Sequence, residues 1–288
     1  MERPRLAAFE IQAPAKINWS LDILGRRADG YHLLDSLMQP LDLSDTLYFL
    51  PSDSLSLEIR GAGGLAADES NLVLRAAKAL HKKAGVQPGA RILLEKRIPM
   101  GAGLGGGSAD AAAALRGLNE FWNLELEEKT LEELGLALGA DVPFCLLDAP
   151  ARAQGIGERL TPVSCARVFP LVLIQPCAAL STQAVFAAYR QSPAQPSCTE
   201  EAIAALAAGD LKRLAANARN ALEPVAIAMR PEMEQARQDL LAQGAGMARM
   251  TGSGSVVFGA FEESQTARRA WMALRGKYPI CLLTKTAL

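Results

Sequence analysis

Hydrophobic and polar residues alternate along the chain between Phe9 and Leu24. One set of alternating side chains is apolar and the other is polar: Ile17, Trp19, Leu21 and Ile23 against Lys16, Asn18, Ser20 and Asp22. Since successive side chains of a strand point to opposite faces, this pattern predicts a half-buried strand. Lys16 and Asn18 then share its polar face.

Other short apolar runs predict more strands. They cover residues 43–50, 54–60, 91–98 and 169–174, with a last strand at the end of the chain. The turn-like residues 25–30 and the spacing of the first three strands predict an antiparallel sheet. Residues 244–261 are typical of a hairpin or loop that leads into a buried strand.

Apolar residues at helical spacing predict helices over residues 71–84, 108–122, 126–138, 200–214, 231–243 and 262–277. Residues 68–70 offer capping groups just before the first of them. Pro143 favours an extended conformation for Val142, which places Asp141 at the end of a connection rather than inside a helix.

The length of the chain, 288 residues, allows one large domain or two ordinary ones. The pattern of residues changes after Gly157, where a predicted apolar strand is followed by the proline- and serine-containing residues 191–197. We therefore expect two domains, residues 1–160 and residues 161–288. No internal repeat with solenoid spacing is visible.

Composition and charge exclude several classes of protein. Half of the residues are hydrophobic, 21% are charged and 5% are aromatic, which is typical of a globular chain. The 30 basic and 31 acidic residues give a net charge of -1, so no global field favours nucleic acid or an anionic membrane. Any site for a polyanion must be local.

Segments that direct export or span a membrane are not evident. Residues 1–6 carry charge, but no apolar stretch with a cleavage site follows them. The apolar residues 168–180 are interrupted by prolines and are shorter than the ~20 residues that a bilayer span needs. We expect a cytoplasmic protein.

The cysteines are scattered and form no CxxC pair: Cys145, Cys165, Cys177, Cys198 and Cys281. Their odd number and wide spacing favour buried free thiols over a disulfide framework or a zinc cluster.

A glycine-rich loop lies between the strand at 91–98 and the helix at 108–122. Its residues are Pro99, Met100, Gly101, Ala102, Gly103, Leu104, Gly105, Gly106, Gly107 and Ser108, followed by Ala109 and Asp110. Glycines let backbone amides approach an anion, and the helix that follows adds the positive end of its dipole. The loop therefore predicts a phosphate site, with Ser108 able to cap the helix or reach a metal-bound phosphate. A packed loop without a ligand is the alternative.

Better-known glycine patterns do not fit this loop. Residues 101–106 satisfy GxGxxG, but a dinucleotide fold requires a second parallel strand ending in an acid, and here the continuation is helical. The Walker pattern fails because no Gly-Lys-Ser/Thr closes the loop. The HRD and DFG triplets of protein kinases are also missing. The loop belongs to another phosphate-binding class.

Three separated segments together resemble the motifs of the GHMP small-molecule kinases. They are Pro-Ala-Lys-Ile-Asn at 14–18, Pro-Met-Gly-Ala-Gly-Leu-Gly-Gly-Gly-Ser-Ala-Asp at 99–110 and Thr-Gly-Ser-Gly-Ser at 251–255. The resemblance covers nearly the whole chain. It implies an α+β fold of two domains, an N-terminal half like domain 2 of ribosomal protein S5 and a C-terminal α/β sandwich, with the active site in the cleft between them.

The resemblance also implies catalytic roles. Asp141 corresponds to the catalytic base, Lys16 to its neighbour, and Asn18 to a residue near the substrate hydroxyl. This agrees with the chemistry, because a positioned carboxylate can accept the proton of a hydroxyl that attacks a phosphorus atom. A nearby lysine would keep that carboxylate ionised and stabilise the charge on the transferred group. The plainer interpretation is a lysine on a solvated face and an aspartate that caps a turn.

Residues 30–32, 139–144 and 155–158 are similar to those family members whose acceptor is a small molecule linked to cytidine diphosphate. In these members a tyrosine–histidine pair and a later aromatic residue hold the cytosine ring. The corresponding residues are Tyr31, His32 and Phe186, with Thr182 in the same segment as Phe186. Flat rings suit a flat base, and an imidazole can exchange hydrogen bonds with its polar edge. His81, inside a predicted helix, is expected at the surface.

On the nucleotide side, the resemblance places Asn71, Lys96 and Asp110 near the adenosine of ATP. Asp110 stands where some relatives have asparagine. Gly252, Ser253 and Gly254 would form a second backbone nest over phosphate groups, although a tight hairpin is the alternative. Mg²⁺ is implied as a companion of ATP, held by phosphates, Ser108 and water.

Alternative functions remain open at this point. A mevalonate- or homoserine-type kinase of the same family would not need a base-binding slot. A catalytically silent nucleotide- or metabolite-binding protein on the same fold is a second alternative. We expect no nucleic-acid or membrane partner and a monomer or weak homodimer.

Overall fold

The computed structural model describes residues 9–28, 30–61, 63–190 and 197–287. The expectations for residues 1–6 and 191–196 lie outside these ranges. Contacts within the chain divide it into two units. Unit 1 comprises Met1–Ala15, Leu43–Ile98 and Gly106–Asp148, and unit 2 comprises Lys16–Asp42, Pro99–Gly105 and Ala149–Leu288. The boundary expected at residue 160 stays a prediction, but in this division residues 16–42 and 99–105 group with the C-terminal part of the chain.

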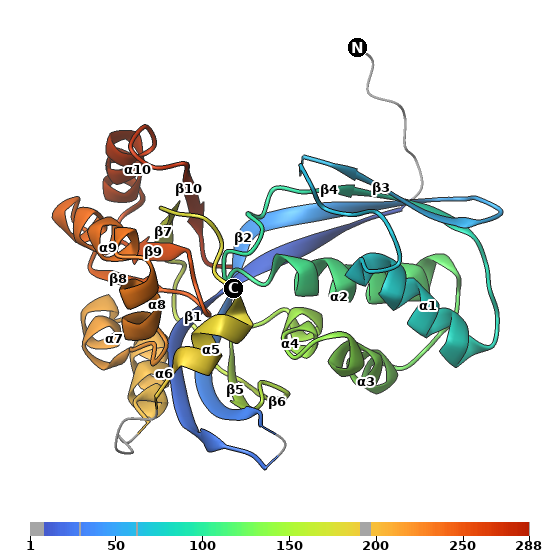
Figure 1. Cartoon of the computed structure of the whole chain (residues 1–288), viewed down its shortest axis with the longest axis horizontal. Coiled ribbons are helices and arrows are strands. Elements are labelled where there is room, and N and C mark those ends of the chain that lie inside the picture. The colour runs from blue at the N-terminus through green and yellow to red at the C-terminus, as the bar shows by residue number, and fades with distance from the viewer. Residues whose placement is uncertain (1–8, 29, 62, 191–196, 288) are drawn as a thin grey trace. The chain divides into compact units, whose positions relative to one another are not determined.

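The sheet of unit 1 has the order β3-β4-β2 (Figure 1). Its strands are β3 (Leu55–Arg60), β4 (Ala90–Glu95) and the second part of β2 (His32–Leu50), and β1 (Phe9–Arg26) pairs with β2. β2 and β4 are antiparallel, whereas β3, which the sequence assigned to an antiparallel sheet with the first two strands, pairs in parallel with β4. The parallel pairing is possible because a helix, α1, connects β3 to β4.

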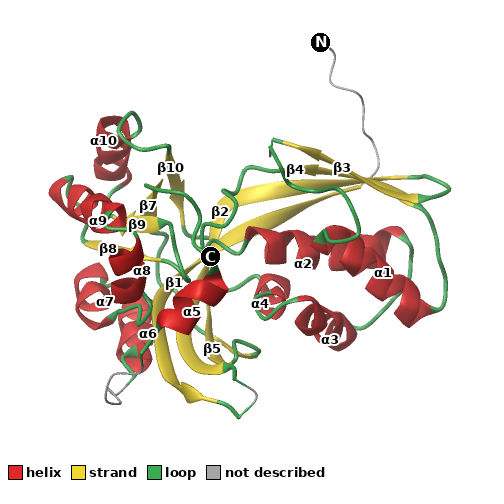
Figure 2. Cartoon of the chain, viewed as in Figure 1, coloured by secondary structure: helices red, strands yellow, loops and turns green. Residues whose placement is uncertain are grey.

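The helices in the described residues of unit 1 are α1 (Leu72–Ala84), α2 (Gly106–Phe121), α3 (Glu128–Leu138) and α4 (Val142–Leu147) (Figure 2). The side chain of Asn71 caps α1 by accepting from the Val73 amide, and Gly85 ends it at φ 69°. Alanines are the commonest residues among the buried positions of α2, which allows a close approach to its neighbours. A Cβ atom at Gly117 would lie 2.4 Å from the ring of Phe49.

Asp141 ends a short turn, as the sequence predicted, but the residues after it form a helix rather than an extended segment. Asp141 has φ -84° and ψ -9° and lies at the N-cap position of α4, so Val142 is helical rather than extended. Pro143 is in the first turn, where the missing N–H costs no helical hydrogen bond. The proline therefore begins a helix here.

The larger sheet of unit 2 is antiparallel throughout, with the order β10-β7-β9-β8. The strands are β7 (Pro170–Gln175), β8 (Met247–Met250), β9 (Val257–Ala260) and β10 (Ile280–Lys285); β5 (Ala151–Gly155) pairs with β2 and with β6 (Arg159–Pro162). Trp19 of β1 packs edge-on against Phe169 and Phe258, with centroids 5.6 and 5.5 Å away.

The helices of unit 2 are α5 (Thr182–Ala188), α6 (Thr199–Ala208), α7 (Leu211–Asn217), α8 (Glu223–Met229), α9 (Glu232–Ala242) and α10 (Ser264–Leu274). The helix predicted over 200–214 is two helices, because Gly209 adopts a left-handed conformation at φ 66°. The short α5 and α8 were not predicted. Their lengths of seven residues give little periodicity to detect.

The polar face of β1 is buried, so the expectation of a half-buried strand was wrong. Lys16 and Asn18 are each 4% exposed, and Ser20 and Asp22 are buried as well. Burial is tolerated because polar partners are supplied: Ser20 bonds to Thr199, and Asp22 forms an ion pair with Arg219.

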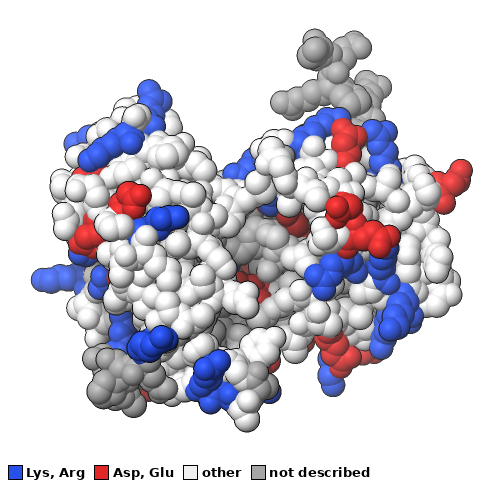
Figure 3. Space-filling model, in the orientation of Figure 1, with Lys and Arg blue, Asp and Glu red and all other residues white. Residues whose placement is uncertain are grey.

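All five cysteines are free, as predicted, but only Cys145 is fully buried. Basic and acidic side chains both occur on the face drawn in Figure 3, in line with the near-zero net charge. Across the described ranges, no helix combines the length and apolar character required for a bilayer crossing.

Candidate active site

The glycine-rich loop connects β4 to α2, as the sequence predicted. Gly101, Gly103 and Gly105 have φ of 60°, 77° and 71°, a region that residues with a Cβ atom avoid. The helix α2 begins at Gly106. Three left-handed turns thus bring the chain to a helix N-terminus, where free amides and the helix dipole favour an anion.

Within unit 2, the loop passes directly against the segment 251–254. A Cβ atom at Gly103 would lie 2.3 Å from the Thr251 carbonyl oxygen, and one at Gly252 would lie 3.0 Å from the Gly103 carbonyl oxygen. The Val256 amide donates to the Ala102 carbonyl over 3.1 Å. These approaches leave no room for a side chain at Gly103 and very little at Gly252.

Lys16 lies under the same loop. Its amide donates to the Leu104 carbonyl over 2.9 Å. A Cβ atom at Gly105 would come within 2.9 Å of its Cγ atom, so glycine at 105 makes space for the lysine side chain. Its ammonium donates to Asn18 Oδ1 over 2.9 Å.

Asn18 connects the first and third motifs. Its amide donates to Thr251 Oγ1 over 3.0 Å, and its Oδ1 accepts from the Gly252 amide over 3.1 Å. Its Nδ2 donates to Ser36 Oγ over 2.8 Å. The three motifs, distant in sequence, therefore meet around one buried asparagine in unit 2.

Asn220, which no sequence pattern singled out, holds the same segment from the other side. Its Nδ2 donates to the carbonyls of Met250 and Gly252 over 3.0 and 2.8 Å, and its Oδ1 accepts from the Leu222 amide. Thr182 and Ser253, both expected in the site, lie with their hydroxyl oxygens 2.8 Å apart.

The residues expected to hold a base include a cluster of rings in unit 2. His32 lies 5.1 Å from Phe186, centroid to centroid, at an interplanar angle of 35°. Tyr189, which was not predicted, meets His32 edge-on at 6.1 Å. Burial lowers the pKa of His32 below its usual 6.5, and the charge of Arg26 lowers it further. Tyr31 is 60% exposed at the turn between β1 and β2.

The residues expected near adenosine lie in unit 1. Asn71 is the cap of α1, and its Nδ2 donates to the Ala66 carbonyl over 2.8 Å. Lys96, just after β4, donates to Asp110 Oδ2 over 2.7 Å and to Asp45, a second carboxylate that the sequence did not indicate. Burial raises the pKa of Asp110 to about 7, with Lys96 acting in the opposite direction and Asp45 in the same one.

Asp141 and Ser108 also belong to unit 1. Asp141 lies at the N-cap position of α4, and its side chain makes no hydrogen bond that caps this helix. A Cβ atom at Gly139, two residues earlier, would lie 3.9 Å from Ser108 Oγ at the start of α2. The turn before α4 and the first turn of α2 are thus neighbours.

Two family models match the chain: the GHMP kinases N-terminal domain over residues 71–149 and the GHMP kinases C-terminal domain over residues 202–280. The 4-diphosphocytidyl-2-C-methyl-D-erythritol kinase of Chloroherpeton thalassium is 39% identical over 279 residues, 96% of this chain and 97% of that protein. The chain belongs to the GHMP kinase family.

Solved structures of GHMP kinases also resemble this chain. The crystal structure of a 4-(cytidine 5'-diphospho)-2C-methyl-D-erythritol kinase matches with a TM-score of 0.83 and 40% identity, covering 97% of this chain and 100% of that one. The homoserine kinase of Cytophaga hutchinsonii matches with a TM-score of 0.78 and 18% identity, covering 100% and 97%. The second likeness shows the shared fold alone. The α+β fold of two GHMP kinase domains expected from the sequence is confirmed.

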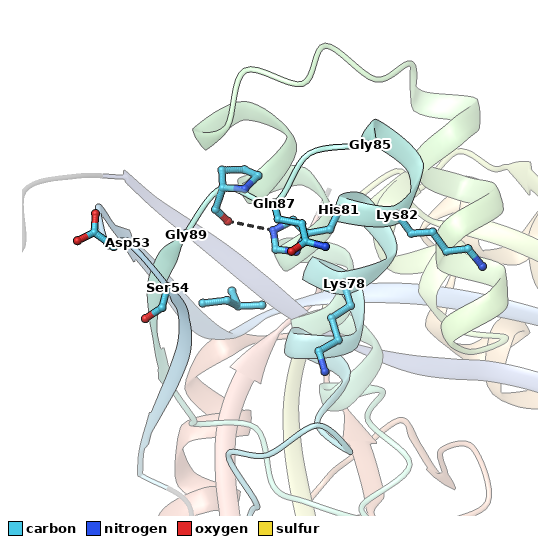
Figure 4. Close-up of a pocket in the computed structure, with 10 residues that line it drawn as sticks. Asp53, Ser54, Lys78, His81, Lys82, Gly85, Gln87 and Gly89 are labelled. Carbon is cyan, nitrogen blue, oxygen red and sulfur yellow. Dashed lines mark hydrogen bonds between the residues drawn. The ribbon is translucent and has the colours of Figure 1, made fainter.

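The GHMP kinase chain also has a pocket of about 700 Å³ on unit 1 (Figure 4). It is lined by Asp53, Ser54, Leu55, Lys78, His81, Lys82, Gly85, Gln87, Pro88 and Gly89. His81 Nε2 lies 3.0 Å from the Pro88 carbonyl, and its ring stacks on Trp122 at 4.6 Å. His81 is therefore a half-buried residue that lines a pocket and packs against Trp122.

For a metal ion, the described residues of this GHMP kinase offer no group of three or more His, Cys, Asp or Glu side chains arranged to hold one. The start of α2 instead offers one possible ligand atom, Ser108 Oγ, next to backbone amides that can bind phosphate oxygens. Such a set suits Mg²⁺ that is bound mainly by phosphate oxygens and water.

Proposed function

We propose that this GHMP kinase transfers the γ-phosphoryl group of ATP to the 2-hydroxyl of 4-diphosphocytidyl-2-C-methyl-D-erythritol, a step in non-mevalonate isoprenoid precursor biosynthesis. The observation that carries the proposal is the similarity, at about 40% identity over nearly the whole chain, to kinases that bear this name. The ring pair of His32 and Phe186 supports it, because a base-linked acceptor needs a flat slot.

We assign the proton transfer to Asp141. Its carboxylate accepts the proton of the 2-hydroxyl as that oxygen attacks the γ-phosphorus, and ADP departs with the electrons of the broken bond. The hydroxyl is tertiary, so orientation of the acceptor matters as much as proton removal. The ammonium of Lys16, held by Asn18, stabilises the charge on the transferred group.

The glycine loop and the first turn of α2 hold the phosphates of ATP through backbone amides. Asn71, Lys96 and Asp110 contact the adenosine. Ser108 Oγ, together with phosphate oxygens and water, would hold Mg²⁺, which would neutralise part of the phosphate charge. Gly252, Ser253 and Gly254 provide a second set of amides for phosphate groups.

The acceptor binds through its base at Tyr31, His32 and Phe186, with Thr182 and Asn18 nearer its reacting end. A neutral imidazole has one donor and one acceptor, which matches the polar edge of cytosine. The low pKa of His32 keeps the ring in this neutral form at physiological pH. The cytoplasmic location and the monomeric or weakly dimeric state remain predictions from the sequence.

A substrate panel tests the acceptor. The purified protein is incubated with ATP, Mg²⁺ and one of the cytidyl substrate, mevalonate or homoserine, and ADP release is measured. We expect ADP only with the cytidyl substrate. Turnover of mevalonate or homoserine without turnover of the cytidyl substrate would contradict the proposal and leave the family intact.

A further inference from the structure

A buried charge cluster in unit 1 contains more negative than positive groups. It consists of Asp45 on β2, Lys96 just after β4 and Asp110 on α2, whose elements are labelled in Figure 1. Their side chains are 0%, 4% and 5% exposed. Two carboxylates share one ammonium, so the cluster is not neutral when both are ionised.

Both carboxylate oxygens of Asp45 accept hydrogen bonds. Its Oδ1 accepts from the amides of Arg97 and Ile98, and its Oδ2 accepts from the Lys96 ammonium. These three donors all belong to the segment that leads from β4 into the glycine loop. Asp45 therefore fixes both the end of that strand and the direction of the lysine.

Asp110 differs sharply from Asp45. Its Oδ2 accepts from Lys96 over 2.7 Å, but its Oδ1 has no hydrogen-bond partner, the one such buried side-chain oxygen or nitrogen in the described part of the chain. A buried carboxylate oxygen without a donor is costly. A donor on a bound ligand would satisfy it.

We propose that Asp45 is a positioning residue for the phosphoryl donor: it holds Lys96 against Oδ2 of Asp110 and so leaves Oδ1 as the acceptor for an N–H or O–H group of the nucleotide. This rests on the proposed roles of Lys96 and Asp110 in nucleotide binding. Asp45 itself touches no substrate. Its action passes through Lys96 and through the amides of Arg97 and Ile98, which directly precede the glycine loop.

The lysine has little freedom to turn elsewhere. A Cβ atom at Gly106 would lie 3.3 Å from its Nζ atom and 3.0 Å from Ile98, so the start of α2 closes over the ammonium. Removing the charge of Asp45 would let Lys96 pair with Asp110 alone. The geometry of Oδ1 would then change although the residues proposed to contact the nucleotide are all present.

The protonation of Asp110 predicts a pH dependence of nucleotide binding. Its pKa is raised to about 7, mainly by burial, and Lys96 and Asp45 are the charged groups that face it. A ligand donor at Oδ1 favours the ionised form. Nucleotide affinity in the wild type should therefore rise as the pH increases through about 7, and loss of the Asp45 charge should move this rise to lower pH.

Asp45→Asn tests the inference, because asparagine keeps an oxygen for the two amides and replaces the carboxylate oxygen that accepts from Lys96 with an uncharged NH2 group. We expect KM for ATP to rise about 10-fold, the scale of one lost charge-assisted hydrogen bond, while KM for the acceptor stays unchanged. The matched control is Asp35→Asn, which removes the charge of another buried aspartate, the partner of Arg152 in unit 2, and should leave KM for ATP unchanged.

The pH profile of KM for ATP separates positioning from loss of stability. Asp45→Asn should shift the profile to lower pH, and Asp110→Asn should flatten it. If Asp45→Asn yields too little folded protein, Asp45→Glu, which displaces the carboxylate by one methylene, replaces it. An unchanged KM and profile in the Asp45 variant, with altered values in Asp110→Asn, would overturn this inference alone. Unchanged values in Asp110→Asn would overturn the proposed nucleotide role as well.

Discussion

The Oδ1 atom of Asn18 accepts a hydrogen bond from the Gly252 amide over 3.1 Å and another from the Lys16 ammonium over 2.9 Å. One buried side chain thus fixes a catalytic candidate and a phosphate-binding candidate that are more than 200 positions apart in the sequence. The separation means that this acceptor organises the candidate site of unit 2 as well as stabilising its fold.

Replacing Asn18 with alanine leaves the buried Gly252 amide and Lys16 ammonium without this acceptor. We expect the free energy of unfolding to fall by about 1–3 kcal/mol, as measured by urea titration, and kcat to fall as Lys16 loses its orientation. Asn119→Ala is the control: Asn119 bonds the amide and carbonyl of Leu126 in unit 1. It should lose stability and keep kcat, so an equal loss of kcat in both variants would contradict the organising role of Asn18.

The sequence predicted the family, most elements and the glycine loop, because these depend on local patterns. Glycine density, helical spacing and the order of strand, loop and helix are all visible without knowledge of tertiary contacts. The three motifs could also be recognised, although nothing in their spacing says that Asn18 bonds directly to Gly252. That contact depends on the packing of β1 against the segment after β8.

What the sequence could not predict depends on pairing between distant elements. Asp45 is a single aspartate in a predicted strand. Its role can be inferred only from the structure, where β2 pairs with β4 and Lys96 donates to it. Asn220 lies between two short helices, one of which gave no periodic signal. The alternation of β1 correctly gave a strand but not the burial of its polar face, since covering segments come from elsewhere in the chain.

Gly103 should not tolerate even a methyl group. In Gly103→Ala the new Cβ atom would lie 2.3 Å from the Thr251 carbonyl oxygen, in addition to the strain of alanine at φ 77°. Gly64→Ala separates the two effects, because Gly64 has φ 83° and nothing within 4 Å of an added Cβ atom. We expect a loss of about 1 kcal/mol for Gly64→Ala from backbone strain, and about 1–3 kcal/mol more for Gly103→Ala from overpacking.

Thermal unfolding measures these losses of stability, and a second assay measures KM for ATP. Gly103→Ala should also raise KM for ATP, since the glycine loop must shift away from the segment 251–254. Equal unfolding free energies for the two variants would show that the loop and this segment are not in tight contact.

The proposed slot for the base should bind the acceptor less tightly only at acidic pH. The pKa of His32 lies below 6.5 because burial, and then the charge of Arg26, disfavours the imidazolium. The folded state therefore favours the neutral ring, and the associated stability is lost as the pH falls below about 6.5. KM for the cytidyl acceptor should stay constant from neutral pH down to about 6.5 and rise at lower pH, where a protonated ring has no acceptor atom.

Two variants test this assignment. Arg26→Gln removes the second cause of the low pKa, so the rise of KM should begin at higher pH. His32→Gln should show a higher KM with no pH-dependent rise in this range. On acidification, a wild-type KM that already rises between neutral pH and pH 6.5 would contradict the role given to the imidazole. The same pH profile of KM in His32→Gln would contradict it as well.

Asp141 and Asp148 flank the same six-residue helix, α4, and allow a matched test of the proposed base. Asp141→Asn removes the proton acceptor while keeping the size of the side chain, so kcat should fall by about 10²–10⁴-fold. Binding of ATP, followed by the fluorescence of a labelled nucleotide, should be retained because no adenosine or phosphate contact is assigned to this residue.

Asp148→Asn should leave kcat unchanged. Asp148 adopts φ 51° at the end of α4, a conformation that asparagine tolerates equally well, so both variants should fold. A kcat for Asp141→Asn near that of Asp148→Asn would remove Asp141 from the proton transfer. A wild-type protein that binds ATP but turns over no acceptor would instead favour a nucleotide-binding protein on a kinase fold, because a base can be tested only where there is a reaction for it to assist.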